Sequence, residues 1–265
     1  MAGGLRKRVV SAVVLAPPVL AALIAGPPYS DILIVAAAAI LAWEWGGIVL
    51  RSRGFAGWLM VPLLAASVAA GSMVSLDLVA FGLVAVAVVT GLAARLERGV
   101  SKPALWLGGG TLYLAPPCLA LLLLRREEPE GLLFVVFVML TVWAADIGGY
   151  FFGKGIGGKK LMPSVSPNKT WAGLYGGMGA AAVTGATVSL LFSEADFIGA
   201  AVLGAGIAVI DQIGDLFESA IKRRFDRKDS SGLIPGHGGL LDRVDGLMPV
   251  ALIVMLLVAF GTGPL

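Results

Sequence analysis

The chain has 265 residues, of which 58% are hydrophobic and only 14% are charged. Soluble domains carry about 25% charged residues, so this composition excludes an ordinary soluble protein and predicts a polytopic membrane protein. The net charge is only +3, and its basic residues are spread over several segments, which suits anionic lipid headgroups and argues against a nucleic-acid-binding protein.

Nine apolar runs are long enough to span a bilayer as helices. In chain order they cover residues 9–26, 31–50, 57–75, 77–96, 104–124, 131–153, 172–193, 197–218 and 247–263. They are about twice as long as a barrel strand and show no polar–apolar alternation, so helices are expected. The turn at residues 71–77 is the hardest to place, because the third and fourth runs are nearly continuous. The expected fold class is therefore all-α, with about nine transmembrane helices.

The distribution of basic residues predicts how these helices are oriented. With a cytoplasmic N-terminus, 18 of the 20 Lys and Arg residues fall in cytoplasmic segments, and only Arg125 and Arg126 fall outside. This is the positive-inside pattern. It predicts an odd number of spans and a C-terminus on the opposite side. The first cytoplasmic segments contribute Arg6, Lys7, Arg8, Arg51 and Arg53.

Residues 1–125 hold five of the predicted helices, joined by short loops, and are expected to form a scaffold or a dimer surface. The clear exception is Glu44, between Trp43 and Trp45 near the end of the second run. The Trp pair is typical of an interfacial belt, which places Glu44 at headgroup level. A role in a site is the alternative for Glu44.

Residues 126–265 hold the other four predicted helices and are expected to be the catalytic region. Two long basic loops, 153–171 and 219–246, lie on its predicted cytoplasmic side. The one cysteine of the chain, Cys118, lies in the fifth run, cannot form an intramolecular disulfide and is expected to be a buried packing residue.

Three acids lie on one face of the eighth predicted helix, because Asp211, Asp215 and Glu218 are spaced by four and three residues. Ionisable groups inside a span are costly and by default functional, and a divalent cation with oxygen ligands is the natural compensation. Two alternatives stay open. Glu218 can pair with Lys222 at i,i+4, and Asp211 can be protonated or act in support.

The most polar segment of the chain, residues 219–245, follows this helix and contains the only His. Asp242 and Asp245 have i,i+3 spacing, so at the start of the ninth helix both would point to one place, near Asp215. This predicts a metal site made of Asp215, Asp242 and Asp245, with a helix N-cap as the alternative for one of the two later acids.

Glycines make residues 235–239 unsuitable for regular helix, and their backbone N–H groups can form an anion-binding nest. His237 can hydrogen-bond a phosphate, move a proton or bind metal, but one His without a suitable Cys argues against zinc. Lys222, Arg223 and Lys228 can neutralise phosphates, with positive-inside topology as the alternative. Residues 166–171, which include Lys169, form a second candidate anion-binding site at the start of the seventh helix.

Residues 219–245 resemble the signature of CDP-diacylglycerol synthases (phosphatidate cytidylyltransferases). The matching positions are Ser219, Lys222, Arg223, Lys228, Asp229, Ser231, Ile234, Pro235, His237, Gly238, Gly239, Asp242, Arg243 and Asp245. A looser similarity extends through residues 146–150, 166–170 and 214–215. Asn168 and Ala172 depart from what relatives often show there, and no catalytic role is carried onto them.

The resemblance implies that CTP and phosphatidic acid give CDP-diacylglycerol and pyrophosphate, in a multi-pass protein of the bacterial inner membrane with a cytoplasmic active site. It implies Mg²⁺, with a second cation as an option, and membrane lipids and a second copy of the chain as partners. The implied catalytic residues are Asp215, Asp242, Asp245, His237 and Lys222. The implied substrate-binding residues are Lys169, Ser166, Ser219, Arg223, Lys228, Asp229, Gly238, Gly239, Arg243 and Asp146.

Two other functions remain as alternatives. A CTP-dependent lipid kinase of the polyprenol or phytol type would also use a cytidine-nucleotide site at the membrane. An ion-coupled transporter would use the intramembrane acids as an ion path, but it predicts charges through the midplane and broken helices in both halves.

Overall fold

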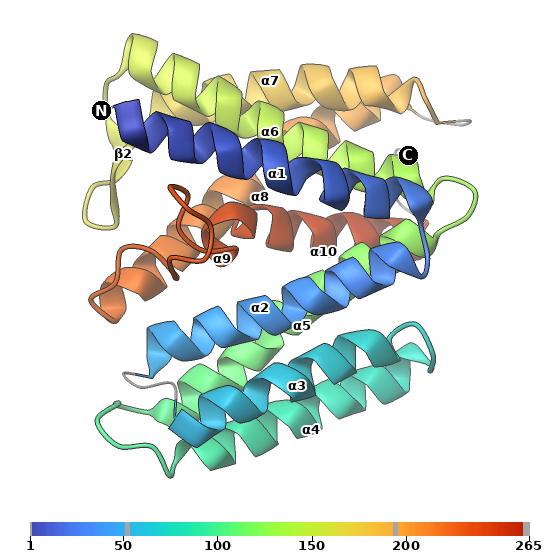
Figure 1. Ribbon diagram of the computed structural model, residues 1–265. Coiled ribbons are helices and arrows are strands. Elements are labelled where there is room, and N and C mark those ends of the chain that lie inside the picture. Colours follow the sequence, from blue (N-terminus) through green and yellow to red (C-terminus); the bar gives the residue numbers. More distant parts are fainter. Residues whose placement is uncertain (1, 51–53, 193–195, 262–265) are drawn as a thin grey trace. The chain divides into compact units, whose positions relative to one another are not determined.

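The computed structural model describes residues 2–50, 54–192 and 196–261 (Figure 1). Within them, each of the nine predicted runs coincides with one helix. These helices are α1 (Ala2–Ala25), α2 (Tyr29–Val49), α3 (Gly54–Ala70), α4 (Leu76–Ala94), α5 (Pro103–Arg126), α6 (Gly131–Ile156), α7 (Trp171–Ser189), α8 (Phe197–Arg224) and α10 (Leu247–Ala259). Arg51, Arg53 and the side chains of Arg6, Lys7 and Arg8, which entered the predicted orientation, lie outside what the structure describes.

Three short elements were not predicted. Strands β1 (Lys160–Met162) and β2 (Ser166–Thr170) form an antiparallel pair in the loop between α6 and α7, and α9 (Leu241–Val244) is a single turn before α10. The difficult turn between α3 and α4 lies where it was expected. The predicted end of the eighth helix was wrong, because α8 continues to Arg224 and carries Ser219, Lys222 and Arg223 with it.

Five helices of the described residues are long and apolar enough to cross a membrane, namely α2, α4, α5, α6 and α8. Shorter apolar helices are α3, α10 and the Val13–Ala25 part of α1. This helical, apolar architecture agrees with a polytopic membrane protein. The full set of nine spans stays a prediction.

The chain divides into two compact units. Unit 1 consists of Met1–Arg126 and Arg224–Val244, and unit 2 consists of Glu127–Arg223 and Asp245–Leu265. The first boundary lies next to the one expected at residue 125, but residues 224–244 cluster with the N-terminal helices. The functional division into scaffold and catalytic region stays a prediction.

In unit 1, α5 contacts α2, α3 and α4 (Figure 1). Trp45 is buried, and its indole Nε1 donates to the carbonyl oxygen of Trp106 at 2.8 Å. The expectation that Trp45 belongs to an interfacial belt was therefore wrong. Cys118 is buried, as expected. Arg125 is also buried, and its guanidinium donates to the carbonyl oxygens of Leu23 and Ile24 at the end of α1, where helical carbonyls lack intrahelical partners.

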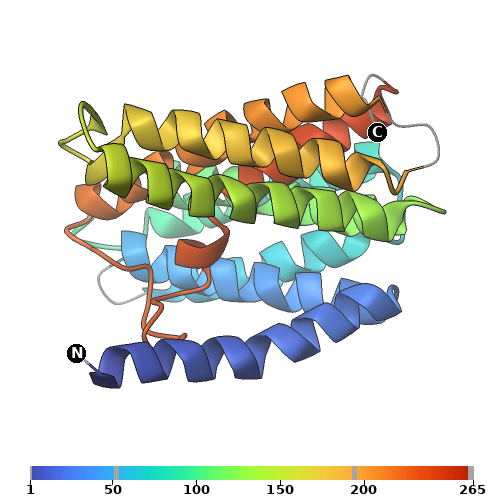
Figure 2. The same cartoon turned by 90° about the horizontal axis from the view of Figure 1, so that it is seen from above.

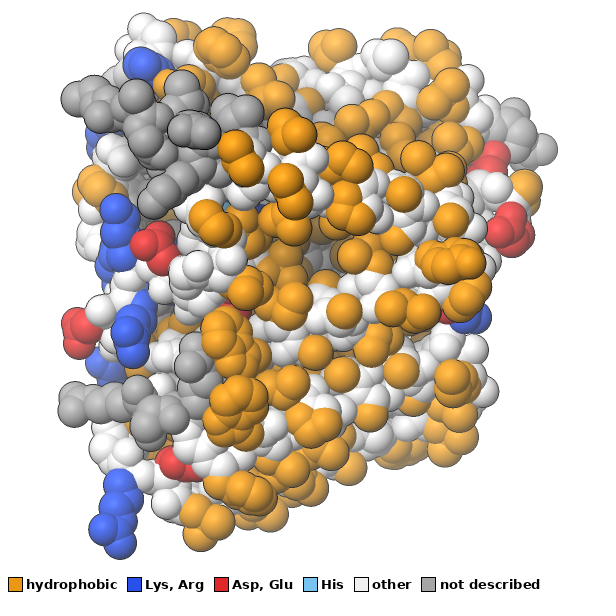
Figure 3. All heavy atoms as spheres, in the orientation of Figure 1, with side chains coloured by type: hydrophobic (Ala, Val, Ile, Leu, Met, Phe, Trp, Pro, Cys, Tyr) orange, Lys and Arg blue, Asp and Glu red, His pale blue; other side chains and the backbone are white. Residues whose placement is uncertain are grey.

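The outer face of α4 is hydrophobic. Its exposed side chains include Leu78, Phe81, Val84, Val88 and Leu92. Figure 3 shows hydrophobic side chains along the surface formed by α3 and α4, with charged side chains at the helix ends. Such a distribution suits helices whose sides face lipid and whose ends face water.

In unit 2, α6 and α7 lie side by side in both views (Figures 1 and 2). Small residues allow this contact, since a Cβ on Gly177 would lie 2.8 Å from the carbonyl oxygen of Ala145. Ala145, Ala181 and Ala208 form a buried cluster between α6, α7 and α8. Close packing of small residues is the usual way in which helices associate in a membrane.

The start of α7 is fixed by Thr170, the last residue of β2. Its hydroxyl accepts a hydrogen bond from the N–H of Gly173 at 3.1 Å, which makes Thr170 the N-cap. We expect Thr170→Ala to lower the free energy of unfolding by about 1 kcal/mol, measured by denaturant unfolding in detergent. Thr187→Ala is the matched control, because this α7 hydroxyl is exposed and bonds only the carbonyl oxygen of Val183. Equal losses in both variants would contradict the capping role.

Candidate active site

Unit 2 gathers four acids from three parts of its chain. Asp211 and Asp215 lie on α8, Asp146 lies on α6, and Asp245 lies between α9 and α10. Asp211 interacts electrostatically with the other three acids, Asp245 also interacts with Asp215 and Asp146, and Lys169 interacts with the three acids on α6 and α8. We call these five residues the carboxylate cluster. The predicted meeting of Asp215 and Asp245 is therefore present in unit 2.

Within this cluster, Lys169 is held by Asp215. The Lys169 ammonium lies 2.6 Å from Asp215 Oδ2, and the hydroxyl of Ser219 donates to Asp215 Oδ1 at 3.3 Å. Burial alone would lower the pKa of Lys169, but attraction to Asp215, and more weakly to Asp146 and Asp211, leaves this pKa above its usual value. Lys169 therefore stays protonated and offers a fixed positive charge beside the acids.

The Lys169 side chain is positioned by the β1–β2 pair. Ser166 begins β2 opposite Met162, and Thr170 ends it opposite Lys160. Residues 166–170 are thus a strand that ends in the cap of α7, where the sequence suggested a turn. Ser166 is half-buried, and its role in substrate binding stays a prediction.

Asp245 lies close to α8. Burial raises the pKa of Asp245 to about 7, and the charge of Asp215 adds to this effect, while a hydrogen bond from the Gly246 N–H opposes it. Gly246 has no room for a side chain, because a Cβ there would collide with the carboxyl group of Asp211. This close approach places the start of α10 against the acidic face of α8.

Glu218 and Lys222 form the i,i+4 pair that was left open as an alternative. Lys222 Nζ lies 2.5 Å from Glu218 Oε2, and both residues are buried. Lys222 is therefore already engaged by a carboxylate of its own helix. A role in phosphate binding for Lys222 stays a prediction.

Unit 1 contains the glycine-rich loop, which we define as residues 225–240. The backbone reverses between Ile234 and Gly238, where Ile234 N–H donates to the Gly238 carbonyl at 2.8 Å. Gly236 and Gly238 have φ values of 83° and 91°, a region that side chains with a Cβ rarely adopt. These two glycines therefore adopt the positive φ values for which glycine was expected in this segment.

Asp242 closes this loop. Its Oδ2 atom accepts hydrogen bonds from the N–H of Ser230 at 2.9 Å, the hydroxyl of Ser230 at 2.9 Å and the N–H of Gly239 at 2.8 Å. Asp242 therefore braces the loop with one oxygen. The structure does not show a helix shared by Asp242 and Asp245, since α9 ends at Val244 and the boundary between the two units follows it.

Glu44 was misjudged from the sequence. Its side chain is 0% exposed, and its carboxyl group accepts hydrogen bonds from the loop and from the first residue of α9. Glu44 is therefore a buried residue that binds the loop, and its level in the bilayer stays a prediction. The sequence offered one signal for this role, namely a single acid within an apolar run. The neighbouring Trp residues favoured a position at the membrane interface as its explanation.

His237 also has a partner that the sequence did not reveal. The hydroxyl of Ser11, on α1, lies 2.9 Å from His237 Nδ1 and 3.3 Å from the Pro235 carbonyl oxygen. Figure 2 shows the loop beside α1. No pattern around Ser11 marked it in advance, because one Ser in an apolar helix is unremarkable.

The other predicted substrate-binding residues have exposed side chains. These are Arg223 at the end of α8, Lys228 and Asp229 in the loop, and Arg243 on α9. Exposure suits both interpretations of the basic residues, binding of phosphates and positive-inside topology. Among the described residues, no three His, Cys, Asp or Glu side chains are arranged as a ready-made metal site.

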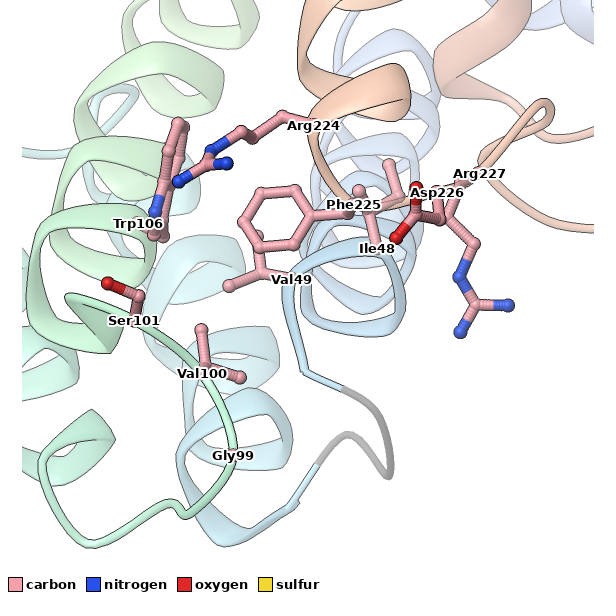
Figure 4. A pocket seen from close by; sticks show the side chains of 10 residues that line it. All are labelled: Ile48, Val49, Gly99, Val100, Ser101, Trp106, Arg224, Phe225, Asp226 and Arg227. Atoms are coloured by element: carbon pink, nitrogen blue, oxygen red, sulfur yellow. The ribbon is translucent and has the colours of Figure 1, made fainter.

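Unit 1 also has a surface pocket (Figure 4). It has a volume of ≈ 210 Å³ and is lined by the ends of α2 and α8, the start of α5, and residues 99–101 and 225–227. Trp106 and Phe225 meet edge to face in it, with ring centroids 5.0 Å apart. None of the predicted site residues lines this pocket.

Comparison with known proteins gives a consistent result. The sequence profile described as "Cytidylyltransferase family" matches residues 6–260. The chain is 37% identical over 261 residues to a phosphatidate cytidylyltransferase of Pseudomonas aeruginosa, covering 92% of this chain and 93% of that protein. It is 33% identical over 273 residues to one of Haemophilus influenzae, covering 92% and 94%.

A phosphatidate cytidylyltransferase of Brucella suis is 45% identical over 159 residues, covering 60% of this chain. This match spans only 59% of the Brucella protein. The family predicted from residues 219–245 is confirmed by the match along nearly the whole sequence, and the chain belongs to the cytidylyltransferase family.

Proposed function

We propose that this protein is a phosphatidate cytidylyltransferase, which transfers CMP from CTP to phosphatidic acid. The observation that carries the proposal is the carboxylate cluster of unit 2, which joins four acids and one lysine in a chain whose residues 219–245 match the signature at every position. Membership in the family favours this function over the lipid kinase and the transporter.

The carboxylate cluster has the composition that a divalent cation requires. Asp146, Asp211, Asp215 and Asp245 place oxygen ligands together, and Lys169 interacts with the first three of them. Mg²⁺ is usually bound by one or two carboxylates together with substrate phosphates and water. We propose that Asp215 and Asp245 hold Mg²⁺ and that Asp242 completes the site, with a second cation as an option.

In the proposed reaction, an oxygen of the phosphatidate phosphate forms a bond to the α-phosphorus of CTP. The bond from that phosphorus to the bridging β-phosphate oxygen breaks, and pyrophosphate leaves with the electron pair. Such transfers depend mainly on positioning and charge neutralisation. Bound Mg²⁺ would neutralise charge on the CTP phosphates.

The remaining roles follow from charge and position. Lys169, fixed by Asp215, would neutralise the lipid phosphate, with Ser166 on the same strand. Lys222, Arg223 and Lys228 would contact the CTP phosphates. The loop, with His237, Gly238 and Gly239, would shape the nucleotide site. Ser219, Asp229, Arg243 and Asp146 would support these contacts.

The assay uses purified protein, phosphatidic acid, Mg²⁺ and CTP labelled either in the cytidine or at the γ-phosphate. We expect cytidine label in the lipid fraction, lost when EDTA removes the metal. Lipid carrying only the γ-phosphate label would contradict the proposal in favour of the kinase. Ion flux into liposomes without CTP turnover would favour the transporter.

We also propose nine spans, a cytoplasmic N-terminus and active site, a C-terminus on the opposite side of the bacterial inner membrane, and a homodimer. The one-to-one match of apolar runs with helices supports the span count. Leu233 lies exposed in the loop, so Leu233→Cys tests the orientation. Labelling of this thiol in intact cells by a membrane-impermeant reagent would contradict a cytoplasmic loop.

Lys169→Gln removes the positive charge beside Asp215. We expect kcat/KM for phosphatidic acid to fall by about 10- to 100-fold, the value of one charge-assisted hydrogen bond, in the same assay. Lys160→Gln is the matched control, because Lys160 is an exposed residue on the neighbouring strand. Equal activities of the two variants would contradict the assignment.

A further inference from the structure

The carboxyl group of Glu44 has a complete set of hydrogen-bond donors. Oε1 accepts from the N–H of Leu240 at 2.8 Å and the hydroxyl of Ser231 at 2.6 Å. Oε2 accepts from the N–H of Leu241 at 2.7 Å and the hydroxyl of Ser230 at 3.2 Å. Each oxygen thus faces one backbone and one side-chain donor, and the single hydroxyl hydrogen of Ser230 can go either to Glu44 or to Asp242.

All four donors belong to residues 230–241, while Glu44 lies on α2. The loop has little regular structure of its own, apart from the reversal at Ile234 and Gly238. Gly239 lies so close that a Cβ there would collide with Glu44 and with Ser230. The successive backbone N–H groups of Leu240 and Leu241 thus bind a carboxyl group of this chain, while the anion nest expected at residues 235–239 stays a prediction.

Glu44 also reaches Asp242 through one residue. The hydroxyl of Ser230 lies within hydrogen-bond distance of both carboxyl groups, at 3.2 Å from Glu44 and 2.9 Å from Asp242. The three residues form a continuous polar network in unit 1. In such a network, the position of each member depends on the others.

We propose that Glu44 is a positioning residue for cytidylyl transfer, which holds the glycine-rich loop on α2 and so fixes Asp242 and His237. Glu44 touches no substrate in this proposal. The inference rests on the proposed function for its catalytic consequence, but the holding of the loop is independent of it. The N-terminal helices then take part in building the active site.

The chemistry requires a group that only accepts hydrogen bonds. In Glu44→Gln, the amide NH₂ would face a backbone N–H, whichever way it is turned, so at least one backbone bond would be lost to two opposed donors. Glu44→Asp keeps four acceptor sites but withdraws them by one methylene. Ser231→Ala removes the 2.6 Å bond to Glu44 and the 3.1 Å bond that the Ser231 oxygen accepts from the N–H of Leu233. It leaves the Glu44 carboxyl group in place and is the mildest change, which protects the test against simple misfolding.

The test measures hydrogen–deuterium exchange of peptides covering residues 230–241, together with kcat and KM for CTP. In Glu44→Gln we expect about 10- to 100-fold faster exchange there. We expect kcat to fall by about 100-fold, the effect of small misplacement, with KM much less changed. Glu44→Asp and Ser231→Ala should lie between this variant and the unchanged protein.

Glu97→Gln is the matched control. Glu97 also accepts a backbone hydrogen bond in unit 1, but this bond comes from Ala56 on α3, at 3.0 Å, and not from the loop. It should leave both readouts unchanged. Native exchange in Glu44→Gln, or fast exchange with an unchanged kcat, would overturn the proposal. Absence of cytidylyl transfer by the unchanged protein would overturn the proposed function, and the exchange result would still decide whether Glu44 holds the loop.

Discussion

Asp215→Asn is expected to lower kcat for cytidylyl transfer by at least about 100-fold, the usual loss when one preorganised charge contact is removed. Asp215 lies at the centre of the carboxylate cluster, with Lys169 at 2.6 Å from one oxygen and Ser219 at 3.3 Å from the other. The amide carries no charge to hold a divalent cation, and it releases Lys169 from its ion pair. Turnover is measured with cytidine-labelled CTP.

The same variant should keep its fold. The side chains of Lys169 and Asp215 are 30% and 26% exposed, and part-exposed ion pairs add little to stability. Asp31→Asn is the matched control, because it also breaks an ion pair of an acid, with Arg126, and neither residue belongs to the carboxylate cluster. Comparable loss of turnover in both variants, or full activity of Asp215→Asn with Mg²⁺, would contradict the assignment.

Asp242→Asn and Asp242→Ala should separate two roles of one residue. An amide oxygen can still accept the three hydrogen bonds from Ser230 and Gly239 that now reach Oδ2. We therefore expect Asp242→Asn to keep slow hydrogen exchange in residues 230–239 while kcat falls by about 100-fold or more. Asp242→Ala should lose both the slow hydrogen exchange and the activity, since it leaves these donors without their acceptor.

Each outcome of that comparison has a clear meaning. Full activity of Asp242→Asn would exclude a requirement for negative charge at this position. Equally fast exchange in both variants would mean that the amide does not replace the carboxylate as a brace. Size-exclusion chromatography in detergent checks that both variants remain folded.

The helices were predictable because apolar runs of about 20 residues have one solution in lipid. The ends of the helices were less predictable. Hydropathy drops at Ser219, yet α8 continues to Arg224, because Lys222 is paired with Glu218 and stays buried. A loss of apolarity therefore marked the edge of the hydrophobic stretch and not the end of the helix.

Part of the site also followed from spacing alone. Asp211 and Asp215 share a helix face, and Asp245 does meet them. The Lys169–Asp215 ion pair did not follow, because it depends on a short strand pair whose sequence looks like an irregular loop. The separate environments of Asp242 and Asp245 were equally hidden, since three-residue spacing predicts one helix face only if the helix continues.

Glu44 shows the limit most clearly. Its partners are 186 to 197 residues away, and no local rule connects an acid on the second helix with a glycine-rich segment near the end of the chain. Such a contact is a property of tertiary structure. The sequence predicted that the N–H groups of residues 235–239 would bind an anion. In the structure, the N–H groups of the next two residues, Leu240 and Leu241, bind the carboxyl group of Glu44.

Unit 1 combines residues from the first half of the chain with residues near its end. This arrangement affects when its contacts can form during synthesis. Ser231 follows Glu44 by 187 residues, so at about 5–20 residues per second the ribosome adds it about 10–40 s later. During that interval the second helix carries an acid whose four donors do not yet exist. The N-terminal unit can be completed only when synthesis is nearly finished, so a nascent chain arrested before residue 230 would expose this acid to quality-control proteases of the membrane.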